Sequence, residues 1–87
     1  MNYIKEINAF NDWINEHDLN ATEQALWYRL MHYCNKLGWK EEFTVTNTKL
    51  ADDLKISRQH LEKCRKKLIK SGLIFYAKRK SWKVRKI

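Results

Sequence analysis

The basic residues of this chain are concentrated in its last third. Residues 57–87 contain twelve Lys and Arg against a single carboxylate, Glu62, whereas residues 1–56 contain six Lys and Arg against nine Asp and Glu. The formal charges of the two parts are therefore +11 and −3, out of a total of +8. Ammonium and guanidinium groups gathered in this way bind phosphate and steer polyanions to one side of a molecule. The pattern indicates nucleic acid as the ligand.

The segment after Ser57 combines this charge with the periodicity of a helix. Leu61, Cys64 and Leu68 recur at three- and four-residue steps and form an apolar face, while long polar side chains occupy the opposite face. A helix fits the major groove of DNA, where its N-terminal residues reach base edges and its flanks meet phosphate. The residues that we expect to read bases are Arg58, Gln59, Glu62 and Lys63.

Phosphate contacts are expected from cations around this helix and from free N–H groups at two helix starts. The alternative is a lysine-rich surface that is merely solvated, which is the usual state of surface charge. The residues predicted to bind phosphate are Thr46, Asn47, Thr48, Ser57, Lys66, Lys67, Lys70, Lys78, Arg79, Lys80, Ser81 and Lys83.

Other chemistries find little support. No pair of cysteines or histidines has the spacing of a structural zinc site, so no metal or other cofactor is expected. The adjacent carboxylates at 41–42 and 52–53 have diverging side chains, and we expect them to be solvated charges. No nucleophile, base and orienting group can be assembled, so we expect neither catalytic residues nor an enzyme. Cys34 and Cys64 lie on apolar stripes and are expected to be inert core thiols.

The first part of the chain predicts two amphipathic helices. Apolar residues at helical steps predict one helix over residues 3–17. Asn20 and Glu23 have the spacing of a capping box, in which each side chain satisfies a free backbone N–H of a second helix. Gly38 is placed to end that helix in a left-handed conformation.

The rest of the chain predicts a short strand and two capped helices. Residues 43–46 are β-branched or aromatic and predict a strand. Thr46 and Ser57 can each cap a helix, and residues 55–56 join the two helices as in a helix-turn-helix. The second of these helices should end at Gly72.

A hairpin is predicted after the last helix, because the pattern changes to a period of two. Residues 73–78 and 82–87 form its strands, residues 79–81 its basic turn, and residues 43–46 a third strand. The predicted fold is mainly α with a small β-hairpin, a winged helix-turn-helix with an added N-terminal helix. The 87 residues suit a single domain, 1–87, with 44% apolar residues to form its core.

The four tryptophans offer a second way to bind nucleic acid, by stacking on unpaired bases. Trp13, Trp27 and Trp39 lie on apolar stripes or beside Gly38, so core packing is expected for them. The position of Trp82, on the hairpin, leaves both interpretations open.

Cysteine usage and hydropathy bear on the compartment. Two cysteines thirty residues apart and no apolar leader after Met1 suit a reducing cytoplasm. No apolar run approaches the roughly 20 residues of a membrane span, so no membrane is expected as a partner.

Several stretches together resemble a known family, the N-terminal winged-helix domain of phage-type replisome organisers, which are DnaD-like replication initiation proteins. The resemblance spans nearly the whole chain, and its most distinctive parts are Trp27, Trp39 and the Phe-Thr-Val strand that begins at Phe43. The stretches that resemble the family are residues 7–13, 25–32, 36–39, 43–45 and 56–61.

The resemblance implies binding to origin DNA in the replication of a phage or mobile element, often as a dimer. The apolar first helix is a candidate for homodimer contact, although closing the domain's own core explains it equally well. In the family a further C-terminal region contacts replication proteins, whereas this chain stops at Ile87, after the hairpin. Either that region is missing or the chain is a stand-alone module. A transcription regulator and a protein-interaction module that binds an acidic partner or an anionic membrane are the alternatives.

Overall fold

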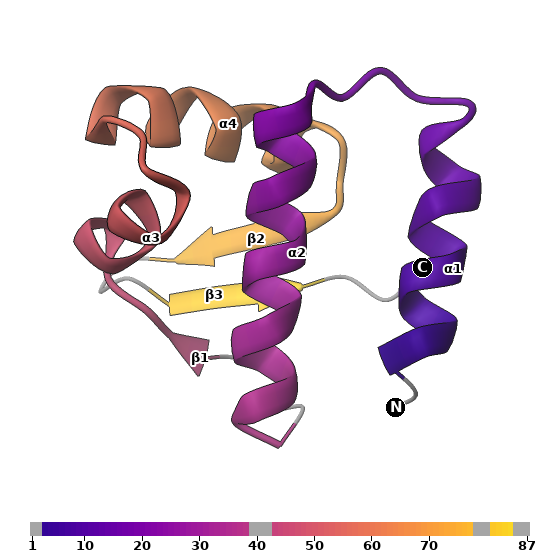
Figure 1. Cartoon of the computed structure of the whole chain (residues 1–87), viewed down its shortest axis with the longest axis horizontal. Coiled ribbons are helices and arrows are strands. Elements are labelled where there is room, and N and C mark those ends of the chain that lie inside the picture. The colour runs from indigo at the N-terminus through magenta and orange to yellow at the C-terminus, as the bar shows by residue number, and fades with distance from the viewer. Residues whose placement is uncertain (1–2, 39–42, 78–80, 85–87) are drawn as a thin grey trace.

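The computed structural model describes residues 3–38, 43–77 and 81–84. Four helices and a three-stranded antiparallel sheet make up this part of the chain (Figure 1). The elements, in chain order, are α1 (Tyr3–Ile14), α2 (Ala21–Lys36), β1 (Phe43–Thr44), α3 (Asn47–Leu54), α4 (Arg58–Lys70), β2 (Ile74–Ala77) and β3 (Ser81–Val84).

Three of the helices begin at the predicted capping residues. The Asn20 side chain accepts a hydrogen bond from the Glu23 N–H at 2.8 Å, and the Glu23 carboxylate accepts one from the Asn20 N–H at 2.9 Å. The hydroxyl oxygens of Thr46 and Ser57 accept bonds from the N–H groups three residues later. These side chains satisfy donors that the first helical turn leaves unpaired, so the helix starts follow from local sequence.

The helix ends agree less closely with the sequence pattern. The prediction for the first helix was too long, because α1 ends at Ile14 and the next residues form a turn in which the His17 N–H bonds to the Ile14 carbonyl. Gly38 (φ +80°) and Gly72 (φ +79°) adopt the predicted left-handed conformation. Lys55 is left-handed as well, with φ 56°, an unexpected conformation for a lysine.

The sheet has the strand order β1-β3-β2, so β1 pairs with β3. The predicted third strand, residues 43–46, was too long, because β1 ends at Thr44 and Thr46 caps α3. Phe43 is opposite Trp82, and Ile74 is opposite Val84. The predicted turn, residues 79–81, wrongly included Ser81, and its other two residues lie outside the described part of the chain. Ser81 is the first residue of β3 and pairs with both Thr44 and Ala77.

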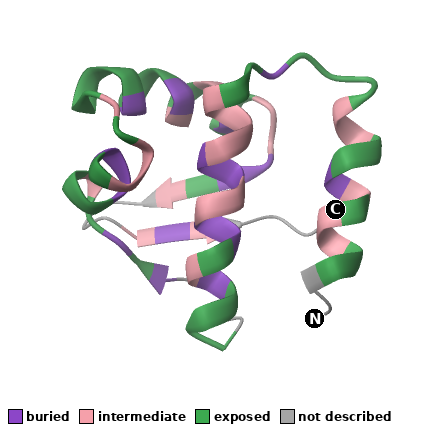
Figure 2. Ribbon diagram, in the orientation of Figure 1, coloured by how far each residue is buried: buried purple, intermediate pink, exposed green. Residues whose placement is uncertain are grey.

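The core lies between the helices and one face of the sheet, as the buried positions in Figure 2 indicate. Trp27 and Trp82 are its largest fully buried side chains. The Trp82 indole N–H donates to the Val45 carbonyl at 3.1 Å. Base stacking by Trp82 is therefore excluded in this conformation, because its ring is enclosed by protein. Trp39 lies outside the described residues.

Helix α1 is attached to α2 mainly through aromatic rings. The Phe10 ring stacks on Trp27 with the centroids 3.8 Å apart, and the Tyr28 ring meets Phe10 edge-on. Tyr28 also donates from its hydroxyl to the Asn11 side chain at 3.2 Å. Phe10 is fully buried, whereas Ile4, near the start of the same helix, is 70% exposed.

Candidate nucleic-acid interface

Helix α4 has one buried face and one exposed face. Leu61, Cys64 and Leu68 are buried in the core that α4 shares with α2, α3 and β2. The predicted base-reading residues, Arg58, Gln59, Glu62 and Lys63, are all exposed. The predicted phosphate-binding residues Lys66 and Lys70 are exposed as well, and Lys67 is half-buried.

The exposed face of α4 is not occupied by polar contacts with the residues that the structure describes. Within the described part of the chain, the four predicted base-reading side chains and those of Lys66 and Lys70 form no hydrogen bond or ion pair. The polar groups of this face therefore point to solvent and can meet an external ligand.

The hairpin and the start of α4 lie on the same side of the molecule, away from α1. In Figure 1 the N-terminal end of α4, helix α3 and the Ala77 and Ser81 ends of the hairpin strands are all on the left, and α1 is on the right. Lys83 is half-buried and faces Phe75 across the strand pair. The predicted contacts Lys78, Arg79 and Lys80 fall outside the described residues.

The two helix starts use their hydroxyl oxygens as caps. Thr46 and Ser57 both accept bonds from backbone N–H groups, although both residues are exposed. Thr48 is exposed, and the Asn47 side-chain oxygen accepts a bond of 3.4 Å from Arg65. Any phosphate at these positions would be bound by backbone N–H groups rather than by the capping oxygens.

Arg65 is a functional candidate that the sequence pattern missed. Its guanidinium lies 4.4 Å from the Tyr76 ring centroid, and its Nη1 donates to Asn47. One side chain thus links α4 to the start of α3 and to β2. We interpret Arg65 as a positioning residue for the basic surface, because a guanidinium can stack on a ring and hydrogen-bond in its plane at once. Only the cross-element contacts identify it.

The prediction for the carboxylate pair at 52–53 was wrong for Asp53. Asp53 is half-buried and accepts a short hydrogen bond from the Tyr33 hydroxyl. The Lys49 ammonium lies 3.1 Å from its carboxylate and the Arg29 guanidinium 3.9 Å. The Tyr33 hydrogen bond is the main cause that lowers the pKa of Asp53, and the two cations add to it against the opposing effect of burial. Asp53 thereby ties α3 to α2.

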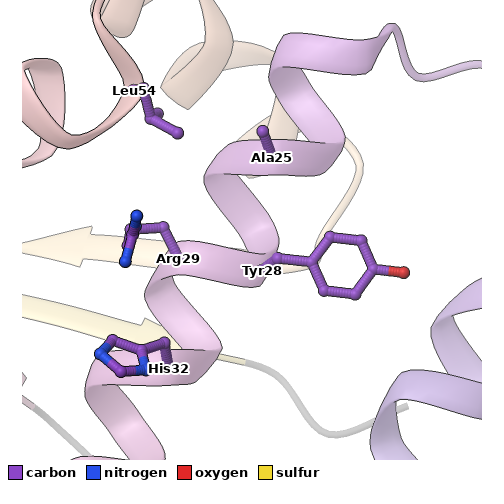
Figure 3. A pocket seen from close by; sticks show the side chains of 5 residues that line it. All are labelled: Ala25, Tyr28, Arg29, His32 and Leu54. Carbon is purple, nitrogen blue, oxygen red and sulfur yellow. The ribbon is translucent and has the colours of Figure 1, made fainter.

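A shallow hollow of about 380 Å³ lies along α2, lined by residues of α2 and by Leu54 of α3. Figure 3 shows Arg29 and His32 on the side of α2 that faces α3, with Tyr28 turned toward α1. Arg29 is already close to Asp53, and the remaining lining residue is Ala25. This arrangement does not gather groups for a specific ligand.

The two cysteines are buried, as predicted. Burial raises the pKa of both thiols, and the Glu23 carboxylate raises that of Cys64 further. Raised pKa values make both thiols poor nucleophiles at neutral pH. Across the described ranges, no three His, Cys, Asp or Glu side chains gather to hold a metal ion.

The same described ranges contain no helix that is both long and apolar enough to cross a bilayer.

No family model, curated protein sequence or solved structure matches the chain.

Proposed function

We propose that the chain is a winged helix-turn-helix domain that binds double-stranded DNA in a sequence-specific manner. Helices α3 and α4 form the helix-turn-helix, and α4 enters the major groove. The hairpin of β2 and β3 is the wing and lies against the flanking backbone. Arg58, Gln59, Glu62 and Lys63 face base edges, while Lys66, Lys67 and Lys70 face phosphate.

The observation that supports this proposal best is the separation of the two faces of α4. Three buried residues hold the helix in the core, so its outer face is presented on a rigid element. That outer face carries exposed polar groups that no described part of the chain uses. A rigid helix with an unoccupied, mainly cationic face suits a groove lined by phosphate and hydrogen-bonding base edges.

A selection from random duplexes, followed by a salt titration, tests the proposal. The preferred duplex should bind more tightly than random duplex. Neutralisation of roughly six to eight phosphates predicts that log K falls against log salt with a slope of about −5 to −7. Binding that is indifferent to salt, or equal for all sequences, would contradict the proposal.

Replication initiation is the biological process that we favour. Origin recognition for a phage or mobile element rests on the resemblance of residues 25–32 and 43–45 to the replisome organisers. A winged-helix transcription regulator would use the same interface. Replication and transcription are therefore distinguished by whether the preferred sequence occurs at a replication origin or at a promoter. If the domain instead binds an acidic protein or anionic vesicles in preference to duplex DNA, it is an interaction module.

Pairing of two copies through α1 belongs to the same proposal. Phe10 is covered by the domain itself, so among the described side chains of this helix Ile4 is the large apolar one that is exposed. Sedimentation at micromolar concentrations should give a dimer for the natural chain and a monomer for Ile4→Glu. A clean monomer of the natural chain, with and without DNA, rules out the pairing.

A further inference from the structure

Glu62 differs in charge from every other ionised residue in the last third of the chain. It lies on the exposed face of α4, with Arg58 one helical turn before it and Lys66 one turn after it. Residues four apart on a helix are neighbours and commonly form ion pairs. Glu62 forms no ion pair or side-chain hydrogen bond with any described residue. Its carboxylate is therefore not committed to a neighbouring cation.

A carboxylate on a DNA-facing surface lowers affinity for phosphate, so a favourable role for it requires a partner on the bases. An ionised carboxylate only accepts hydrogen bonds. In the major groove, guanine presents two acceptors and thymine an acceptor beside its methyl group. Adenine offers an amino donor, but its N7 acceptor lies beside it and repels a carboxylate oxygen. Cytosine presents its N4 amino donor alone. The chemistry of the groove therefore selects cytosine.

We propose that Glu62 makes the site specific for a cytosine that lies within about two base-pair steps of a guanine contacted by Arg58. The inference rests on the proposed function and names the sequence class that the domain prefers. Four helical residues rise about 6 Å, close to two base-pair steps of about 3.4 Å. The preferred site thus contains a guanine and a cytosine no more than about two steps apart. At sites without this cytosine, Glu62 faces acceptors and reduces binding.

The substitution Glu62→Ala tests this role because its two effects have opposite signs. On random duplex, loss of the negative charge should strengthen binding about 3- to 10-fold. The ratio of preferred to random affinity should fall about 10- to 100-fold, because the base contact is lost. Asp12→Asn is the charge-matched control, because Asp12 is exposed on α1, and Figure 1 shows α1 as a whole apart from α4. It should leave the affinity ratio unchanged.

A modified base gives an independent measurement on the natural chain. N4-methylcytosine keeps its pairing hydrogen but places a methyl group where the major-groove N–H was. N4-methylcytosine at the selected position should lower the affinity of the natural protein for the duplex about 10-fold or more. The affinity of the Glu62→Ala variant should hardly change.

Two outcomes separate the inference from the proposed function. If Glu62→Ala strengthens binding to preferred and random duplex by the same factor, Glu62 is only a surface charge and the inference fails while duplex binding stands. If the natural chain prefers no sequence at all, the proposed function and the inference fail together.

Discussion

Helices α1 and α4 are both amphipathic and have almost the same length, twelve and thirteen residues, yet they are held in different ways. Helix α4 begins at a capping serine and inserts three side chains into the core. Among the described side chains of α1, Phe10 is the one that is fully buried, against the rings of α2, while Ile7, Trp13 and Ile14 pack against the core in partly buried positions. The comparison indicates that the helix proposed to read DNA is also the more firmly anchored one, as precise recognition requires.

The largest expected effect tests that anchoring. Leu61→Ala should lower the free energy of unfolding by about 2 to 5 kcal/mol, because Leu61 is fully buried and its loss leaves a cavity. Binding to every duplex should decline together with the folded fraction. Urea unfolding and DNA titration of the same samples measure both. Ile69→Ala, on the same helix at 39% exposure, is the control and should cost less than about 1 kcal/mol.

The second prediction separates base reading from charge on the outer face of α4. Arg58→Ala and Gln59→Ala should each cost about 1 to 3 kcal/mol on the preferred duplex and much less on random duplex. Stability should not change, because both side chains are exposed. Lys36→Ala removes the same charge as Arg58→Ala, in the last turn of α2, and should not affect the preference. Figure 1 shows that end of α2 on the opposite side of the sheet strands from α4. An unchanged ratio of preferred to random affinity would show that α4 does not read the sequence.

The third prediction concerns the C-terminal half of α4, which we propose to face phosphate. The double variant Lys66→Ala, Lys70→Ala should lower the affinity for preferred and for random duplex alike, by about tenfold near physiological salt. The slope of log K against log salt should become shallower by about 1.8, since each lost phosphate contact changes it by about 0.9. Anisotropy titrations at several salt concentrations give both values. A slope equal to that of the natural chain would place the two lysines away from the DNA.

The smallest expected effect concerns the link between α2 and α3, on which the position of the helix pair depends. The hydrogen bond from Tyr33 lowers the pKa of Asp53 in the folded state. The ionised carboxylate therefore stabilises the folded state fully above about pH 4, and this contribution is lost as the pH falls through the lowered pKa. Burial and the Asp53 contact raise the pKa of Tyr33, so no loss is expected at high pH until above about pH 10.

Tyr33→Phe should therefore reduce the free energy of unfolding by about 1 kcal/mol at pH 7, and the difference should shrink at acid pH. Urea unfolding of both proteins at pH 7 and at acid pH measures this difference in the free energy of unfolding. Tyr28→Phe is the control, because that hydroxyl bonds to Asn11 at an exposed site and should contribute less. If both variants lose the same free energy of unfolding at pH 7, the Tyr33–Asp53 contact stabilises the fold no more than an exposed hydrogen bond does.

What the sequence determined by itself was mostly local. Asn20, Thr46 and Ser57 cap helices as predicted, because an N-cap side chain needs only the backbone of the turn that follows it. Gly38 and Gly72 are left-handed for an equally local reason, since glycine has no Cβ to oppose that conformation. The two faces of α4 also followed from spacing, because helical periodicity alone decides which residues share a face.

The tertiary structure decided which contacts form between elements far apart in the chain. The burial of Trp82 depends on Val45, thirty-seven residues earlier, and Asp53 depends on Tyr33, twenty residues earlier. Arg65 acquires its role only where α3, α4 and β2 meet. Periodicity reports which face of an element a residue lies on, but not which element packs against that face. Those pairings depend on how the whole chain fills its core, so they could be known only from the folded structure.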